Sequence, residues 1–158
     1  MAIVVVFLIA MLGLLVVGWQ SRKRRQSGVA APQSVPADPG RAVGTFAGKY
    51  VATTASGDPY DRIAVHGLGF RGAAAVTVAD LGLLVQRPGE SDFWVAAADV
   101  RGIRRATWTI DRVVEPDGLQ LIEFTLGDRV VDSYFRMDEA DAFEKAVVSL
   151  IATERQAQ

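Results

Sequence analysis

Residues 119–154 read LQLIEFTLGDRVVDSYFRMDEADAFEKAVVSLIATE, and the hydrophobic period changes once within this stretch. At first, apolar side chains recur at every second position, which predicts a β-strand with one inward face, carried by Ile122, Phe124 and Leu126. Gly127 and Asp128 favour a hairpin turn into a second strand. After Asp138 the spacing becomes helical, which predicts one apolar helix stripe, formed by Phe143, Val147, Leu150 and Ile151. We therefore expect a hairpin followed by an amphipathic helix that covers one opening of a curved sheet.

The β pattern extends back from this stretch to Gly48. Short β-branched and aromatic runs are interrupted about every eight to twelve residues by Gly, Pro, Asp or Ser, which is typical of a mostly β fold. The expected strands lie at 49–54, 60–66, 73–79, 83–87, 93–96, 101–110, 119–126 and 129–136. Together with the terminal helix they form one domain over residues 44–158, and about 115 residues is a usual size for a single core.

Residues 2–19, AIVVVFLIAMLGLLVVGW, contain no charged side chain. As a helix they would measure about 27 Å, enough for a thin bilayer, so we expect one transmembrane helix. No Lys or Arg precedes this run, whereas a basic cluster follows it, formed by Arg22, Lys23, Arg24 and Arg25. Basic flanks stay in the cytoplasm, so the N-terminus is expected outside and the domain on the cytoplasmic side of the inner membrane. A cleaved secretory signal is the alternative, but its positive charge would precede the apolar run.

Residues 20–43 join the apolar run to the domain. After the basic cluster this segment is rich in Ser, Gln, Ala and Gly, with prolines at Pro32, Pro36 and Pro39. Such a composition favours a flexible linker rather than a folded element. About 24 residues would give a root-mean-square reach of about 25 to 30 Å. We therefore expect a juxtamembrane tether that lets the domain explore the nearby membrane surface.

The charge balance argues against nucleic acid as a partner. The chain has 17 basic and 18 acidic residues, but from Arg41 onward there are 13 basic and 17 acidic residues. A domain with a net negative charge and no large Lys/Arg cluster cannot neutralise a phosphate backbone. The absence of cysteine excludes disulfides, thiolate nucleophiles and cysteine-based metal sites.

No catalytic, cofactor or metal site is expected. The stretch 67–72 satisfies the pattern G-x-G-x-x-G, but no crossover helix follows it, so a glycine-rich turn is favoured over a dinucleotide site. His66 is the only histidine, and a lone histidine at a strand end is usually structural. The sequence therefore predicts a protein that is not an enzyme.

One basic and aromatic cluster inside the domain is a candidate interaction patch, formed by Arg101, Arg104, Arg105 and Trp108. An arginine beside an aromatic ring can bind a phosphate or a protein partner. In a regular strand, however, Arg101 and Arg105 would share one face with neither Arg104 nor Trp108. A solvated sheet face is therefore favoured over a defined site, although this region is where a binding surface is first expected.

The order of elements resembles the pleckstrin-homology (PH) superfold, in which about seven antiparallel strands are followed by one amphipathic helix. More specifically, residues 50–151 resemble the bacterial PH-like family of small membrane proteins with a single N-terminal span. The residues that carry this resemblance are Tyr50 to Thr54, Asp61 to Ile63, His66 to Arg71, Gly82, Arg87 to Gly89, Val100, Gly118, Leu119, Phe135 and Arg136. They cover about two-thirds of the chain. By analogy, the resemblance implies an interaction or scaffold role with no established reaction and no cofactor.

The chain departs from the eukaryotic PH domains that bind phosphoinositides. Those domains place several Lys and Arg residues in the first hairpin. Here no basic residue lies between Lys49 and Arg62, whereas Asp58 and Asp61 do. Specific phosphoinositide recognition is therefore not expected.

The leading functional hypothesis is a membrane-anchored scaffold that uses its strand edges or the arginine and tryptophan region to hold a protein partner. One alternative is a domain that docks on anionic lipid, although its own charge is negative. Another is an accessory subunit of a transporter, whose span would pack on other helices through Gly13 or Gly18.

Overall fold

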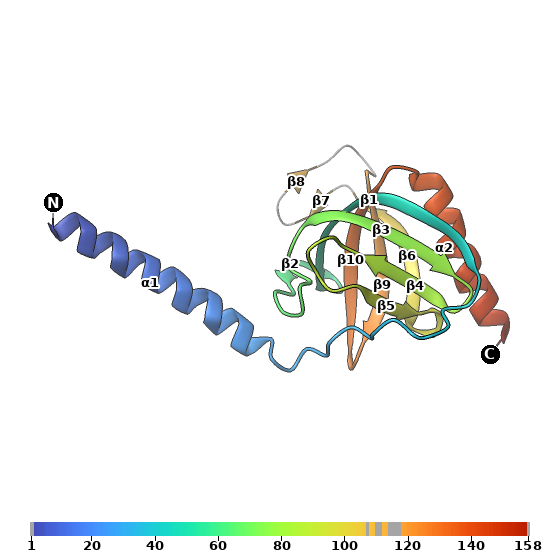
Figure 1. Ribbon diagram of the computed structural model, residues 1–158, viewed down its shortest axis with the longest axis horizontal. Coiled ribbons are helices and arrows are strands. Elements are labelled where there is room, and N and C mark those ends of the chain that lie inside the picture. Colours follow the sequence, from blue (N-terminus) through green and yellow to red (C-terminus); the bar gives the residue numbers. More distant parts are fainter. Residues whose placement is uncertain (1, 107, 110–111, 114–117, 158) are drawn as a thin grey trace.

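A computed structural model describes the chain over residues 2–106, 108–109, 112–113 and 118–157, without the side chains of residues 2, 19, 22–25, 108–109 and 112–113. A mostly β body carries one long helix that extends away from it and a second helix packed along its side (Figure 1). The elements are α1 (Ala2–Arg25), β1 (Ala42–Ala55), β2 (Asp58–Arg62), β3 (Gly72–Ala79), β4 (Gly82–Gln86), β5 (Phe93–Ala96), the 3₁₀ turn η1 (Ala97–Asp99), β6 (Val100–Ala106), β7 (Trp108–Thr109), β8 (Arg112–Val113), β9 (Leu119–Leu126), β10 (Arg129–Met137) and α2 (Ala140–Ala157).

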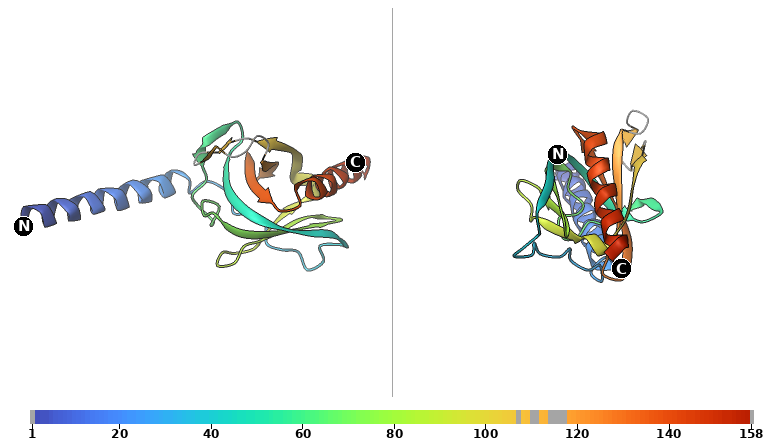
Figure 2. Two further views of the ribbon diagram at one scale, coloured as in Figure 1. Left: turned by 90° about the horizontal axis from the view of Figure 1, so that it is seen from above. Right: turned by 90° about the vertical axis from the view of Figure 1, so that its right-hand side faces the viewer.

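The main sheet is antiparallel and follows the order β5-β4-β3-β1-β10-β9-β6, with β2 paired to β1 and a separate β7–β8 pair. The long strand β1 joins the two halves: its residues 42–50 pair with β3, and residues 48–55 pair with β10. A bulge between Tyr50 and Ala52 accompanies this change of partner. Because bulges bend a strand, the sheet curves around its inner face (Figure 2).

The inner face of the sheet and α2 form one core. Phe143 and Val147 are fully buried, and Leu150 and Ile151 are nearly so, which confirms the stripe predicted for the terminal helix. The Phe143 ring contacts Phe46 from β1 edge to face, with 5.4 Å between the ring centroids. The predicted inward residues of β9, namely Ile122, Phe124 and Leu126, are also buried in this core. The mostly β fold with one C-terminal helix is therefore confirmed.

The strand predictions agree closely with the structure for five strands, whereas β1, β2 and β6 have other bounds. The bounds of β5 and β9 are as predicted, and those of β3, β4 and β10 differ by one residue. β2 lies at 58–62 rather than 60–66, and the strand predicted at 101–110 ends at Ala106, with residues 107, 110 and 111 outside the described part. β1 starts at Ala42, seven residues early. Its glycines look like a linker, but a Cβ at Gly48 would overlap the carbonyl oxygen of Arg136, so glycine permits close pairing there.

Residues 26–41, the N-terminal strap, belong to the segment predicted as a flexible linker but contact the domain at several points. Gln26 is 9% exposed. Its Nε2 donates to the carbonyl oxygen of Arg62 (2.8 Å), and its Oε1 accepts from the backbone N–H of Ala64 (2.7 Å). Val29 is 4% exposed and belongs to the core. A tether with free reach does not describe this segment, because Gln26 satisfies two backbone groups of the domain and Val29 is buried in its core.

The strap continues along the edge strand β5. The carbonyl oxygen of Gln33 accepts from the backbone N–H of Trp94 (2.9 Å), and the Gln33 side chain donates to Asp99 (2.9 Å). Leu81 then donates to the carbonyl oxygen of Pro39 (3.4 Å). The strap is therefore hydrogen-bonded to the sheet at Gln33 and again at Pro39, shortly before β1 begins.

Helix α1 projects from the body (Figure 1). All of its described side chains from Ile3 to Gly18 are exposed. In the part of the chain whose side chains are described, no helix is both long enough and apolar enough to cross a membrane. The transmembrane helix expected at 2–19 therefore stays a prediction from the sequence. The side chains of Trp19 and of the topology determinants Arg22, Lys23, Arg24 and Arg25 lie outside the described residues.

Candidate functional site

The arginines of β6 are distributed by a bulge rather than by simple alternation. The register of β6 against β9 shifts between Val100 and Gly102, which adds one residue to β6. Arg101 Nε consequently donates to Thr125 Oγ1 (3.2 Å) and Arg104 NH1 to Glu123 Oε2 (3.4 Å), so both reach the outer face of β9. The prediction that Arg101 shares a face with Arg105 is wrong, because the extra residue reverses the alternation.

Arg105 is engaged by α2. Its Nε and NH2 donate to Glu144 Oε2 (3.0 and 2.8 Å), and NH2 also contacts Asp141. Hydrogen bonds to Glu144 and then to Asp141 raise the pKa of Arg105 further above its ordinary value. This side chain thus joins β6 to the first turns of α2, although it is still 37% exposed. Trp108, the fourth member of the predicted patch, has a side chain outside the described residues.

Arg104 belongs to a polar cluster on the outer face of the sheet. Its NH2 donates to Asp132 Oδ2 (3.2 Å), which also accepts from the backbone N–H of Gly57 (3.4 Å). Ser56 Oγ donates to Glu123 Oε2 (3.1 Å). Asp132 is only 2% exposed, and its Oδ1 is buried with no hydrogen-bond partner among the described residues. This carboxylate was not predicted from the sequence, although Asp132 is the one acidic residue of β10 and follows two valines.

Burial of Asp132 has a consequence for stability. Desolvation raises the pKa of Asp132 above its ordinary value of 3.8, against the opposing effects of the Gly57 N–H and Arg104. A carboxyl group whose pKa is raised by folding favours the folded state while it is protonated, below about pH 4. That contribution is lost as the pH rises through the folded-state pKa. At neutral pH the charged form is therefore a cost to the fold.

The variant Asp132→Asn should consequently be more stable than wild type at pH 7, with a free energy of unfolding about 1 kcal/mol higher. Asparagine keeps an oxygen for Arg104 and Gly57 without a buried charge, and the gain stays small because its amide NH2 takes the place of Oδ1, which has no hydrogen-bond partner among the described residues. The measurement is urea denaturation of the full chain in detergent micelles between pH 4 and 7, where the variant should also show a flatter pH dependence. Asp132→Ala, which removes the acceptor, is the destabilised control. An asparagine variant less stable than wild type at pH 7 would contradict this reasoning.

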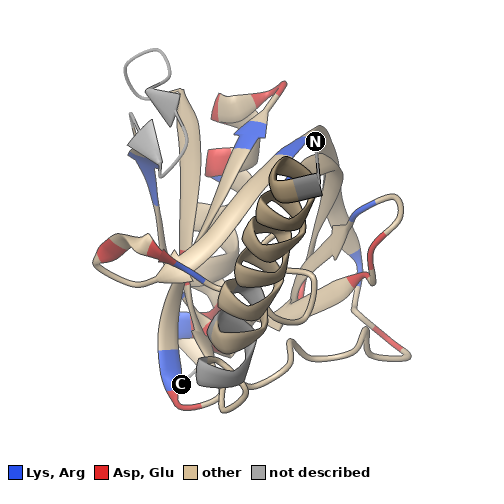
Figure 3. Cartoon of the chain, turned by 90° about the vertical axis from the view of Figure 1, so that its left-hand side faces the viewer, with Lys and Arg blue, Asp and Glu red and all other residues tan. Residues whose placement is uncertain are grey.

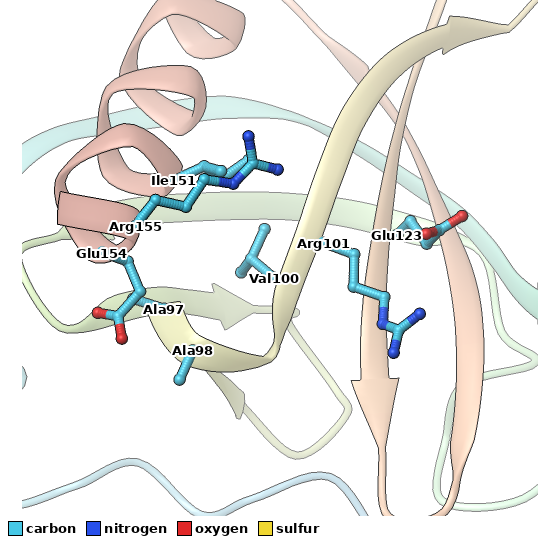
Figure 4. A pocket seen from close by; sticks show the side chains of 8 residues that line it. All are labelled: Ala97, Ala98, Val100, Arg101, Glu123, Ile151, Glu154 and Arg155. Atoms are coloured by element: carbon cyan, nitrogen blue, oxygen red, sulfur yellow. The ribbon is translucent and has the colours of Figure 1, made fainter. Parts of the chain in front are cut away.

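A groove lies where η1 and the start of β6 meet the last turns of α2 (Figure 4). Its volume is about 300 Å³, and its lining residues are Ala97, Ala98, Val100, Arg101, Glu123, Ile151, Glu154 and Arg155. Val100 and Ile151 are buried apolar side chains, whereas Arg101 and Arg155 are exposed. Arg155 extends from α2 toward β6, and Arg101 leaves β6 on the side of β9 (Figure 4). The groove thus offers an apolar floor between two cations, together with two carboxylates.

The two edges of the main sheet differ. The edge at β5 is covered by the N-terminal strap through the hydrogen bond from Trp94 to Gln33. The edge at β6 pairs with β9 on one side, and no strand of the described residues pairs with its other side. Residues 101–106 of β6 are half-buried or exposed. Because an open edge presents unpaired backbone groups, β6 is the strand best placed to accept an extended segment from another chain.

The interior of the domain contains buried polar groups and a very small internal space. Tyr50 Oη donates to the carbonyl oxygen of Leu68 (2.7 Å) and contacts Thr53 Oγ1 (2.6 Å). Burial raises the pKa of Tyr50 to about 12, against lowering by Thr53 and Arg87. The internal space beside Phe93, Phe124 and Phe135 measures about 10 Å³. Tyr50 and Thr53 therefore hold the loop at Leu68 against the core.

The motifs tested for chemistry have structural positions. Residues 67–70 form a turn shortly before β3, with Phe70 N–H donating to the carbonyl oxygen of Gly67 (3.4 Å), so the glycine-rich turn is confirmed. His66 Nε2 lies 2.9 Å from the carbonyl oxygen of Val29 and thereby contacts the strap. Among the described residues, no group of three or more His, Cys, Asp or Glu residues could hold a metal ion.

The domain also matches a known family. The model of the family described as bacterial PH domain-like matches residues 28–150, which begin within the N-terminal strap and end inside α2. A comparison with curated proteins found no match. The matched region includes the strap, in agreement with its packing on the sheet.

Proposed function

Because the chain belongs to the bacterial PH domain-like family, we propose that it is a membrane-anchored, non-enzymatic module that holds a protein partner on the cytoplasmic side of the inner membrane. The family supports a general interaction role. Beyond this general role, we propose that the partner is a protein, that α1 is a membrane anchor and that the domain lies on the cytoplasmic side.

The open edge of β6 beside the groove is the observation that supports a protein partner. An extended peptide that pairs with β6 would gain main-chain hydrogen bonds from the edge and specificity from the groove. Its apolar side chain would contact Val100 and Ile151, and a neighbouring carboxylate would lie near Arg101 or Arg155. The covered β5 edge offers no equivalent surface, because Gln33 already occupies it.

The support for the anchor is the exposure of α1. Its large apolar side chains between Ile3 and Val17 are 48 to 85% exposed, and they lie on all sides of the helix. Such a helix has nothing apolar to pack on in the rest of the described chain, and a bilayer would supply it. The basic cluster after residue 21 supports the cytoplasmic placement of the domain.

Photo-cross-linking in cells tests the partner surface. A photoreactive amino acid replaces Ala98, which is exposed and lines the groove, or Ala73, an exposed alanine of β3, as the matched control. We expect a discrete adduct from position 98 and none from position 73, and Arg101→Glu should reduce its yield at least threefold. Equal adducts at both positions, or none at position 98, would refute the β6 groove as the partner site.

Exchange of the helix separates the scaffold from a transporter accessory subunit. Residues 2–19 are replaced by an unrelated transmembrane helix while the strap and domain are kept. A scaffold should retain the adduct from position 98, because the groove and the placement at the membrane are unchanged. Loss of the adduct with the new helix would assign the recognition to α1 itself and favour the transporter reading.

A further inference from the structure

The end of α1 is joined to the domain without a flexible segment between them. α1 ends at Arg25, and the next residue is Gln26, whose side chain binds the backbone of Arg62 and Ala64 with hydrogen bonds of 2.8 and 2.7 Å. The residue that directly follows α1 is therefore hydrogen-bonded to the end of β2 and to the chain just after it. If α1 is in a bilayer, this end of the domain lies at the membrane surface.

The same end of the domain carries two exposed aromatic side chains. Phe70 follows Gly69, where an added Cβ would be 3.1 Å from the Cα of Ala64, the residue whose N–H Gln26 accepts. Phe70 is 52% exposed, and Tyr60 on β2 is 65% exposed. In Figure 1, β2 lies on the side of the body from which α1 extends. Aromatic rings are the side chains that settle at the membrane–water interface.

From this arrangement we propose that the domain rests on the bilayer in one fixed orientation, with Tyr60 and Phe70 in the interfacial layer of the phospholipid. The proposal rests on the anchor of the proposed function and adds the surface that faces the lipid. Two further contacts oppose rotation of the domain about the Gln26 junction: Val29 is buried in the core, and Gln33 pairs with Trp94. The domain is thus held by its strap as well as by α1.

We expect the domain to contact the apolar part of the membrane interface rather than to bind anionic lipid headgroups. β2 includes Asp58 and Asp61, which would repel anionic lipid. Figure 3, which views the molecule from the side of α1, shows acidic and basic segments interspersed in the coloured parts of the domain around the helix. Contact through the two aromatic rings should therefore occur on zwitterionic lipid.

Because the chain has no cysteine, single cysteines give unique labels for the test. Phe70→Cys and Leu81→Cys are a matched pair, since Leu81 is 55% exposed. They lie beyond opposite ends of β3, whose eight residues span about 26 Å. Ile9→Cys reports on α1. Each full-length variant carries a fluorescent label in phosphatidylcholine vesicles that contain either a headgroup-attached or a deep acyl-chain nitroxide quencher.

We expect the headgroup quencher to quench the label at position 70 at least threefold more than the label at position 81, and the deep quencher to quench position 9. Quenching at position 9 with equal values at 70 and 81 would overturn this inference and leave the anchor intact. No quenching at position 9 would overturn both. Replacing a quarter of the lipid by anionic phosphatidylglycerol should change nothing, and quenching at position 70 that appears only with this lipid would overturn the aromatic contact.

Variants of Gln26 test the fixed orientation. Gln26→Ala removes both hydrogen bonds to the domain, whereas Gln26→Glu keeps the acceptor for the Ala64 N–H. With alanine the ratio of quenching at positions 70 and 81 should fall toward one, while quenching at position 9 stays unchanged. Glutamate should give an intermediate ratio. A ratio unaffected by Gln26→Ala would show that the contact does not orient the domain.

Discussion

Replacing Leu8 and Leu12 together by arginine is expected to release the protein from membranes. Both side chains are exposed on α1, by 56 and 66%, and they lie four residues apart on one helix face. An arginine near the middle of a transmembrane helix costs about 2.5 to 3.5 kcal/mol, so the pair would shift partitioning by about four orders of magnitude. Flotation of cell lysates on a density gradient measures the result, because aggregates do not float with lipid.

The control for this prediction is Leu8→Ala with Leu12→Ala. It removes the same two side chains but adds no charge, so this variant should still float with the membranes. If the double arginine variant also floats after a high-salt and carbonate wash, α1 is not the anchor and the span predicted from residues 2–19 is refuted. Release of both variants would instead indicate that α1 binds the membrane only marginally.

The parts of the fold that were predictable from the sequence depend on local periodicity. α2 was identified because Phe143, Val147, Leu150 and Ile151 repeat along one helix face, and burial of this stripe needs only a neighbouring sheet. β9 was identified by its period of two. In both cases the same residues that form the element also form its buried face, so a single window of sequence contains the whole signal.

The strap was not predictable because its contacts are few and distant. Gln26 binds residues 36 and 38 positions later, and Gln33 pairs with Trp94. Neither contact belongs to a periodic sequence pattern. A segment rich in Pro, Ser and Gln also has the same composition whether it is a free linker or packed on a domain. Only Val29 is a large apolar side chain that the strap buries deeply in the core. The information therefore lies in pairing across the fold, which local patterns do not contain.

The sequence predicted which strand contains the candidate site, but not the directions in which its arginines point. β6 was identified, but the extra residue between Val100 and Gly102 moved Arg101 to the face of Arg104. Gly102 is compatible with such an irregularity without requiring one. The role of Arg105 depended on Glu144, 39 positions later. The groove itself needs α2 to end beside η1, which is a property of the packed structure alone.

The largest loss of fold stability is expected at Arg87, and the expected drop for Arg87→Ala is about 3 to 4 kcal/mol. Arg87 is 4% exposed. Its NH1 donates to the carbonyl oxygen of Gly67 (2.8 Å) and its NH2 to that of Ser91 (3.2 Å). The guanidinium carbon lies 4.8 Å from the ring centroid of Tyr50 and 5.0 Å from that of Phe93. Alanine would leave a void between the two rings and two carbonyl groups without their donors.

Arg87→Met separates packing from charge at the same position. Methionine fills much of the space between Tyr50 and Phe93, but it donates no hydrogen bond and carries no charge. The arginine charge is itself costly here, because Arg87 Nε is buried without a hydrogen-bond partner among the described residues. Methionine should therefore lose only about 1 to 2 kcal/mol, mainly for the carbonyls of Gly67 and Ser91. Urea denaturation of the full chain in detergent micelles, followed by tryptophan fluorescence, measures both variants.

The order of the two variants decides between the explanations. If packing between the rings dominates, methionine is clearly more stable than alanine, as expected. If the cation over Tyr50 and Phe93 dominates instead, methionine and alanine should be equally destabilised, and Arg87→Lys should retain most of the stability. A loss below 1 kcal/mol for alanine would refute both explanations, since Arg87 would then stabilise neither the Gly67 turn nor the core it covers.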